Sequence, residues 1–170
     1  MQLLTMKEET RKLILDWMRK IHTMEYASRF TSIRWKNLNL WLGIPALIIG
    51  ISIGAVPKIS ILSDSVQVII PIGGMIIAIL TGLQTFLKPT EKAESYRKMS
   101  VKYEELRHKV EIILQADNED TAKLGLERIR KDWSSIDSLN VSNKAFKDAK
   151  VKVKGFKKYP EELGFLETIS

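Results

Sequence analysis

The sequence predicts an all-α membrane protein: a hairpin of two transmembrane helices, an amphipathic helix before it and an antiparallel helical hairpin after it. Two observations support this fold class. The 170-residue chain has two long stretches without a charged side chain, residues 37–57 and 65–87, and only the short loop 58–64 separates them. At about 1.5 Å per residue, the helices would be roughly 32 and 35 Å long, enough to cross a hydrocarbon core of about 30 Å. Because a bilayer interior cannot hydrate backbone groups, each stretch is expected to span as a helix.

Two other interpretations of the apolar stretches fit less well. Buried core helices of a soluble domain seldom run past about 20 residues without a charge, whereas a membrane span requires this. A cleaved signal peptide has an apolar core of about 7 to 15 residues near the start of the chain. Here 36 residues, eight of them Lys or Arg, precede the first stretch. We therefore expect two transmembrane helices.

Residues 1–36 are expected to contain a cytoplasmic amphipathic helix over 7–35. Apolar side chains recur there at spacings of three and four, which is typical of one helix face. They are Ile14, Trp17, Met18, Ile21 and Met24. This face either packs against other helices or lies flat on the membrane, and we favour packing.

The apolar pattern of residues 88–140 predicts a cytoplasmic helical hairpin. A heptad-like apolar pattern runs over 90–115, the polar run 117–120 interrupts it, and a second pattern follows over 122–136. Two such patterns joined by a short polar turn are typical of an antiparallel helix pair.

The sequence of residues 141–170 predicts a short helix and a lysine-rich tail. Ser142 is expected to cap a helix that continues through Ala149, and seven lysines fall within residues 144–158. The tail either binds anionic lipid or nucleotide phosphate or is solvated, and we favour a solvated tail.

The net charge of +7 is distributed in a way that predicts topology. Residues 1–36 carry +4, the loop 58–64 is neutral, and the segment after Leu87 carries +3. Because Lys and Arg near span ends favour the cytoplasmic side, both termini are expected there. The expected anchors at the membrane interface are Arg29, Arg34, Trp35, Lys36, Trp41, Lys88, Lys92 and Arg97. Nucleic acid is disfavoured as a partner because the basic residues lack interleaved aromatic side chains.

The residues for catalysis or metal binding are sparse. The chain has no cysteine, and His22 and His108, its only histidines, lie in different helical segments without nearby ligands at metal-binding spacing. No phosphate-binding loop, nucleophile elbow or metalloprotease motif is present. The sequence therefore predicts a protein that is not an enzyme and holds no cofactor or metal.

Small residues recur on one face of each predicted span. In the first span they are Gly43, Ala46, Gly50 and Gly54; in the second they are Gly74, Ala78 and Gly82. Such faces let helices approach closely, which matters in lipid because apolar burial gives no net drive for association. The contact is either within one hairpin or between chains of a homo-oligomer.

Polar residues in the second span are also ordered. Gln67 lies near the loop, while Thr81, Gln84 and Thr85 share a face near the other end. One interpretation is a pore lining that closes at the apolar residues 75–80 by excluding water. The other, which we favour, is that the threonines bond to their own helix and Gln84 lies at the interface or bonds a neighbour.

The segment after the second span resembles a known family. Residues 86–97, FLKPTEKAESYR, continuing to Tyr103 and Leu106, are similar to the corresponding segment of the SLATT family. These are bacterial two-transmembrane proteins named for their association with SMODS nucleotidyltransferases and SLOG nucleotide-sensing domains. Residues 26–30 and Trp35 fit the same pattern, so the resemblance covers roughly residues 10–145.

The resemblance implies an effector of bacterial conflict systems in the inner membrane. Such proteins are thought to oligomerise and perforate or depolarise that membrane when a nucleotide signal or phage cue appears. The family supplies no catalytic residues, and this chain has no recognisable fused sensor domain. A sensor would be the cytoplasmic hairpin or a separate protein. The alternative is a non-conducting membrane scaffold that recruits a cytoplasmic partner.

Overall fold

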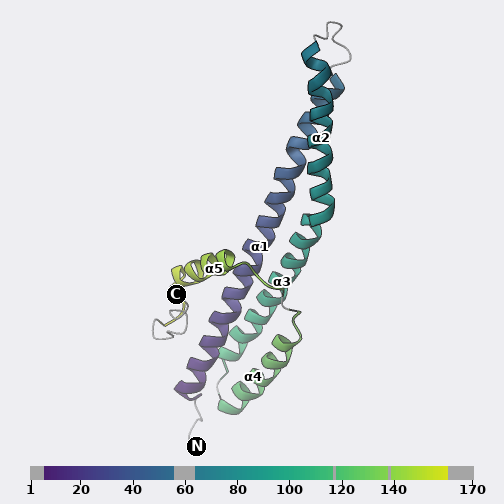
Figure 1. Ribbon diagram of the computed structural model, residues 1–170. Helices are drawn as coiled ribbons and strands as arrows, with labels where there is room; N and C mark the ends of the chain where they lie inside the picture. Colours follow the sequence, from purple (N-terminus) through teal and green to yellow (C-terminus); the bar gives the residue numbers. More distant parts are fainter. Residues whose placement is uncertain (1–5, 56–63, 117, 138, 161–170) are drawn as a thin grey trace, which may run out of the picture. The chain divides into compact units, whose positions relative to one another are not determined.

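The computed structural model describes residues 6–55, 64–116, 118–137 and 139–160. Its regular secondary structure there is helical, which confirms the predicted all-α class. The helices are α1 (Glu8–Ala55), α2 (Asp64–Leu87), α3 (Pro89–Leu114), α4 (Glu119–Ser134) and α5 (Asn143–Gly155), shown in Figure 1. Apart from Asp64, the predicted loop 58–64 lies outside the described residues.

The chain divides into two compact units. The first unit comprises Met1–Ser32 and Ser95–Ser170, and the second comprises Ile33–Glu94. Helices α1 and α3 each contribute residues to both units, whereas α2 belongs to the second and α4 and α5 belong to the first.

Helix α1 continues without a break through the segment predicted as amphipathic and the first apolar stretch. Glu8 and Glu9 in its first turn complement the positive end of the helix dipole. No Gly or Pro interrupts the chain before Gly43, and Pro45 lies inside the helix without ending it. One helix of 48 residues therefore forms part of both units.

The junction between α2 and α3 is set by Pro89. Proline cannot donate the backbone hydrogen bond that would continue α2, but it suits the first position of a new helix. Lys88, just before it, adopts a left-handed conformation with φ 46°, and its N–H donates to the carbonyl of Gln84 at 3.2 Å. Helix α2 consequently ends at Leu87, where the sequence predicted.

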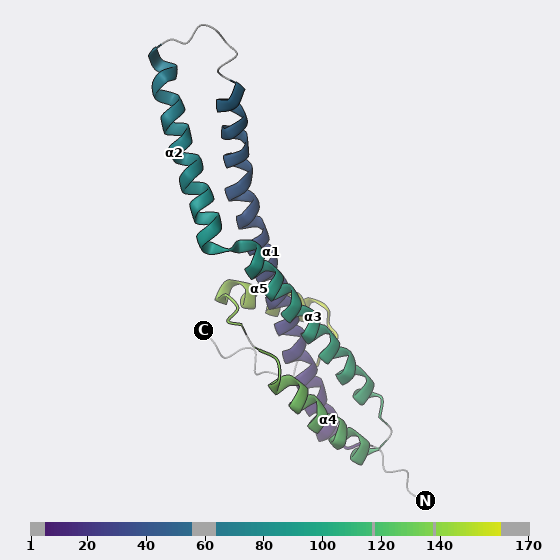
Figure 2. The ribbon, with the colours of Figure 1, turned by 90° about the vertical axis from the view of Figure 1, so that its right-hand side faces the viewer.

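The first unit is built around a core shared by α1, α3 and α4, which run beside one another in Figure 2. The favoured packing of the apolar face of residues 7–35 is consistent with this core, because three of that face's five residues are buried in it. The buried core residues are Ile14, Met18, Ile21, Met99, Tyr103, Leu106, Val110, Ala122, Leu126 and Ile129. Trp17 and Trp133 meet edge to face beside it, with ring centres 5.9 Å apart.

Helices α3 and α4 pack antiparallel. Lys109 pairs with Asp132, whereas Ile113, one turn further along α3, contacts Gly125, nearer the start of α4. A Cβ on Gly125 would lie 2.7 Å from Cγ1 of Ile113, so only glycine allows this approach. The side chain of Asn118 caps α4 by accepting from the N–H of Thr121 at 2.7 Å.

Helix α5 begins as predicted, but its predicted end was wrong. Ser142 caps it by accepting from the N–H of Ala145, and the helix continues past Ala149 to Gly155. The alternation of Lys and Val after Ala149 does not break the helix. Val153 lies four residues after Ala149 and eight after Ala145, so all three are buried on one face.

Candidate functional site

The second unit pairs α2 with the later part of α1, side by side in Figures 1 and 2. Both helices are long and apolar enough to cross a membrane by length and composition. Their apolar side chains remain outside any core: Leu47 is 63% exposed, Met75 61% and Phe86 85%. Since a helix of a soluble core hides such side chains, these surfaces suit a hydrocarbon environment.

Three glycines lie where α2 approaches α1. A Cβ on Gly73 would lie 2.7 Å from Cδ1 of Ile53 and 3.4 Å from Cγ2 of Ile49. This is the tightest glycine contact between α1 and α2. A Cβ on Gly43 would meet Nε2 of Gln84 at 3.4 Å, and one on Gly50 would meet Ile77 at 3.9 Å. Small residues therefore line the contact within the hairpin.

Four other predicted small residues, Gly54, Gly74, Ala78 and Gly82, lie away from this contact. A Cβ on Gly54, Gly74 or Gly82 would meet nothing within 4 Å. Ala78 is exposed and Ala46 is half-buried. The regular set Gly74, Ala78 and Gly82 thus remains an open face of α2.

The polar residues of α2 bond in two ways. Nε2 of Gln84 donates to Oδ1 of Asn39 on α1 at 2.6 Å, across the helix pair. Oγ1 of Thr81 donates to the carbonyl of Ile77, and Oγ1 of Thr85 donates to that of Thr81 at 2.9 Å, both within α2. These bonds correspond to the interpretation favoured from the sequence, in which the threonines bond to their own helix and Gln84 bonds a neighbouring helix. Gln67 lies in α2, but its side chain is outside those described.

The predicted interface anchors occur in both units. In the second, Nζ of Lys92 stands 4.4 Å from the ring centre of Trp35, and Trp41 is 77% exposed. Lys88 pairs with Glu91. The two remaining predicted anchors in that unit, Arg34 and Lys36, lie on α1. Arg29 and Arg97 belong to the first unit.

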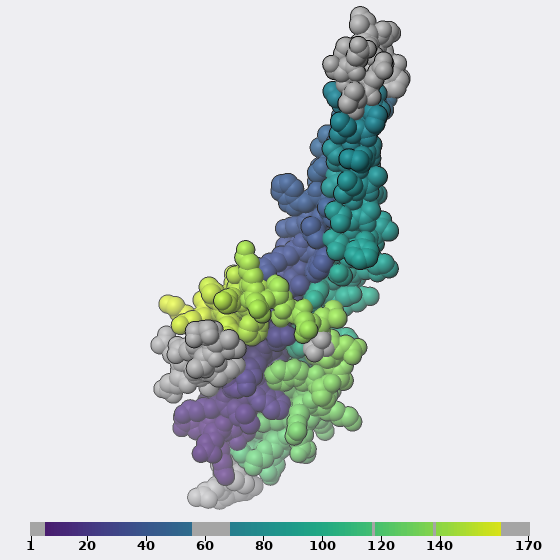
Figure 3. Space-filling model, in the orientation of Figure 1, coloured from purple at the N-terminus to yellow at the C-terminus, as the bar shows by residue number. Residues whose placement is uncertain are grey.

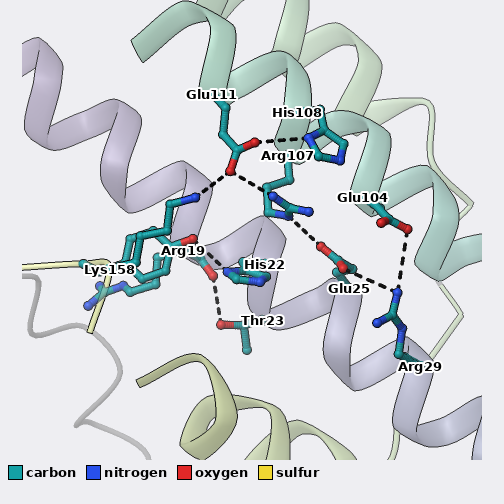
Figure 4. A network of polar contacts seen from close by, with 11 residues as sticks. Arg19, His22, Thr23, Glu25, Arg29, Glu104, Arg107, His108, Glu111 and Lys158 are labelled. Atoms are coloured by element: carbon teal, nitrogen blue, oxygen red, sulfur yellow. Dashed lines mark hydrogen bonds and ion pairs between the residues drawn. The ribbon is translucent and has the colours of Figure 1, made fainter. Parts of the chain in front are cut away.

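A network of charged side chains joins three segments of the first unit (Figure 4). Nε of Arg107 on α3 donates to Oε2 of Glu25 on α1 at 2.9 Å, and its NH1 donates to Oε1 of Glu111 at 2.8 Å. The ammonium of Lys158, which follows α5, donates to the same Glu111 oxygen at 2.7 Å. Arg29 lies within 4 Å of both Glu25 and Glu104. Charge therefore alternates along the whole chain of contacts.

His22 lies beside this network. Its Nδ1 is hydrogen-bonded to the hydroxyl of Tyr159 at 2.8 Å, and its ring stacks on Phe156 with centres 5.3 Å apart. Burial, reinforced by the positive charges of Arg107 and Lys158, lowers the pKa of His22 to about 4. The ring is therefore neutral at pH 7. Through its contacts with Tyr159 and Phe156, His22 holds the chain after α5 against α1.

Sequence patterns did not identify several of these residues as members of the site. Glu25 continues the spacing of Met18 and Ile21, so its position in the apolar pattern was a signal for a buried charge. Asn39 in the first apolar stretch was a signal for a polar partner of Gln84. Nothing local marked Tyr159 as a partner of His22.

No family model, curated protein or solved structure matches the chain. Within the described ranges, no group of three or more His, Asp or Glu residues is placed to hold a metal ion. Among the described residues of the second unit, the close contact at Gly73 and the hydrogen bond of Gln84 to Asn39 join α1 and α2.

Proposed function

We propose that this chain is a two-span effector of a bacterial conflict or anti-phage system. It resides in the inner membrane and forms homo-oligomers that perforate or depolarise that membrane when a nucleotide or phage cue is sensed. The observation that carries the proposal is the open face of α2. Gly74, Ala78 and Gly82 keep small side chains there with no contact to α1.

Topology follows from the flanking charges. Residues 1–36 and the segment after Leu87 are both basic, which favours a cytoplasmic location for both termini and for the first unit. The exposed side chain of Trp41 and the pair of Lys92 with Trp35 suit the interfacial zone. The cue would then reach the first unit directly or through a separate sensor protein.

Oligomerisation is required because a single hairpin cannot enclose water. The contact of α2 with α1 already uses Gly73, so a second contact needs another small-residue face, and Gly74, Ala78 and Gly82 supply one. Thr81 and Thr85 are exposed beside it. Their oxygens retain lone pairs for water although their hydrogens are donated to α2.

Ala78→Leu tests this proposal in the full chain. The larger side chain should block the open face, abolish crosslinked oligomers, and reduce membrane depolarisation in expressing bacteria and dye leakage from liposomes at least tenfold. Ile79→Leu is the matched control, because it changes shape but not volume at a neighbouring exposed position. A chain that never depolarises cells or leaks, even when expressed with its cognate system, contradicts the pore.

A groove in the first unit favours a second candidate, a scaffold that recruits a cytoplasmic partner. The end of α3 and the start of α4 border about 510 Å³ of space, with Ile112 70% exposed and Leu124 59% exposed at its edge. Replacing both spans with an unrelated hairpin distinguishes the candidates. A scaffold keeps its activity after this exchange, whereas a pore loses it.

A further inference from the structure

We propose that the outward face of α5, formed by Lys144, Lys147 and Lys154 around Val151, docks on anionic lipid headgroups. The surface belongs to the first unit, and the proposal does not depend on whether the apolar helices conduct. It gives the lysine-rich segment a defined partner.

The faces of α5 are sorted by residue type. Ala145, Ala149 and Val153 form the buried side. At about 100° per residue, the opposite side carries the four residues of the proposed surface. All four are exposed, and Val151 is the most exposed apolar side chain of the helix, at 74%. Figure 3 shows α5 at the surface of the first unit.

This face carries a net positive charge, with the exposed carboxylate of Asp148 at its edge. Lys144, Lys147 and Lys154 have no ion pair within the described part of the chain, whereas Lys109 and Lys158 of the same unit do. Three ammonium groups around one point give a local positive potential that suits a surface of negative headgroups. Each lysine near such a surface strengthens binding roughly fivefold, and three together about a hundredfold.

The apolar centre of the face favours lipid over nucleic acid. Nucleic-acid surfaces interleave basic residues with aromatic rings on which bases stack. Here the aromatic rings near α5 lie off the face, where Lys150 stands over Phe146 and Lys152 over Phe156. Val151 offers no stacking plane, but a small apolar side chain among lysines can enter the boundary between headgroups and acyl chains.

The test uses the absence of cysteine from the chain. Val151→Cys gives the full-length protein a single site for an environment-sensitive fluorophore. The labelled protein is reconstituted in vesicles of phosphatidylcholine, with or without about one third phosphatidylglycerol. We expect a blue shift and quenching by spin-labelled lipid only in the anionic vesicles. Both should be reversed near 1 M salt, where the Debye length is about 3 Å.

Two triple variants of the labelled protein identify the surface. Lys144→Gln, Lys147→Gln and Lys154→Gln together should abolish the shift. The matched control removes the same charge from exposed positions of α3 and α4, and should preserve the shift: Lys102→Gln, Arg130→Gln and Lys131→Gln.

Three results would overturn the proposal. The emission could be the same in both vesicles. The control triple could lose the shift as fully as the α5 triple, which would show a bulk charge effect. Soluble RNA or DNA could produce the shift in neutral vesicles, which would assign the face to nucleic acid. Circular dichroism of each variant checks that the helices are retained.

Discussion

Replacing Arg107 with glutamine is expected to destabilise the first unit by about 3 kcal/mol. The side chain of Glu25 is 3% exposed and that of Arg107 14%, with Nε and Oε2 2.9 Å apart. At an effective dielectric constant of about 20, unit charges about 4 Å apart attract by about 4 kcal/mol, and desolvation offsets much of this. Removing one partner leaves the other charge buried, which costs about 3–5 kcal/mol. We expect the lower value because Arg29 still lies 3.8 Å from Glu25.

The assay is denaturant unfolding of the full chain in mild detergent, followed by tryptophan fluorescence. Trp17 and Trp133 lie beside the core of the first unit and report on it. Trp35→Phe and Trp41→Phe, introduced into every variant, remove the signal of the second unit. The measured quantity is the free energy of unfolding of each variant relative to this background.

Two further variants separate a buried ion pair from a surface one. Glu25→Gln with Arg107→Gln should lose less stability than Arg107→Gln alone, because no charge stays buried. Lys109→Gln breaks a largely exposed pair with Asp132 and should cost less than about 1 kcal/mol. Glu25→Gln alone completes the comparison. A cost below about 1 kcal/mol for Arg107→Gln, or a double variant whose loss equals the sum of the two single losses, would refute the reasoning.

Three other changes in the first unit have expected outcomes in the same assay. Because the pKa of His22 is about 4 when folded and near 6.5 when unfolded, its contribution is complete above pH 6.5 and is lost as the pH falls towards 4. The full loss should be about 3 kcal/mol, and His22→Phe should flatten this part of the pH profile. Gly125→Ala should cost about 1–3 kcal/mol through overlap with Ile113, and Ile113→Ala should relieve the overlap. Lys157 has φ 50°, so Lys157→Gly should raise stability by up to about 1 kcal/mol and Lys157→Val should lower it.

Local signals were sufficient to place the helices but not to pair their side chains. Pro89 and Ser142 act through their own backbone or the next turn, so the starts of α3 and α5 were readable from sequence. Contacts between Gln84 and Asn39, or between His22 and Tyr159, join residues 45 and 137 positions apart. Such pairs depend on how whole helices approach, which no local pattern specifies.

The two units differ in what stabilises them. In the first unit, buried apolar side chains stabilise the packing of α1, α3 and α4, and the Glu25–Arg107 pair lies within that packing. In the second unit the apolar side chains remain exposed, so α1 and α2 associate through the close contact at Gly73 and the hydrogen bond of Gln84 to Asn39. In lipid, where apolar burial gives no net drive, such contacts largely determine helix pairing. Changes at Gly73 should therefore loosen the hairpin itself, while changes at Ala78 should leave the hairpin intact and act only on the proposed contacts between chains.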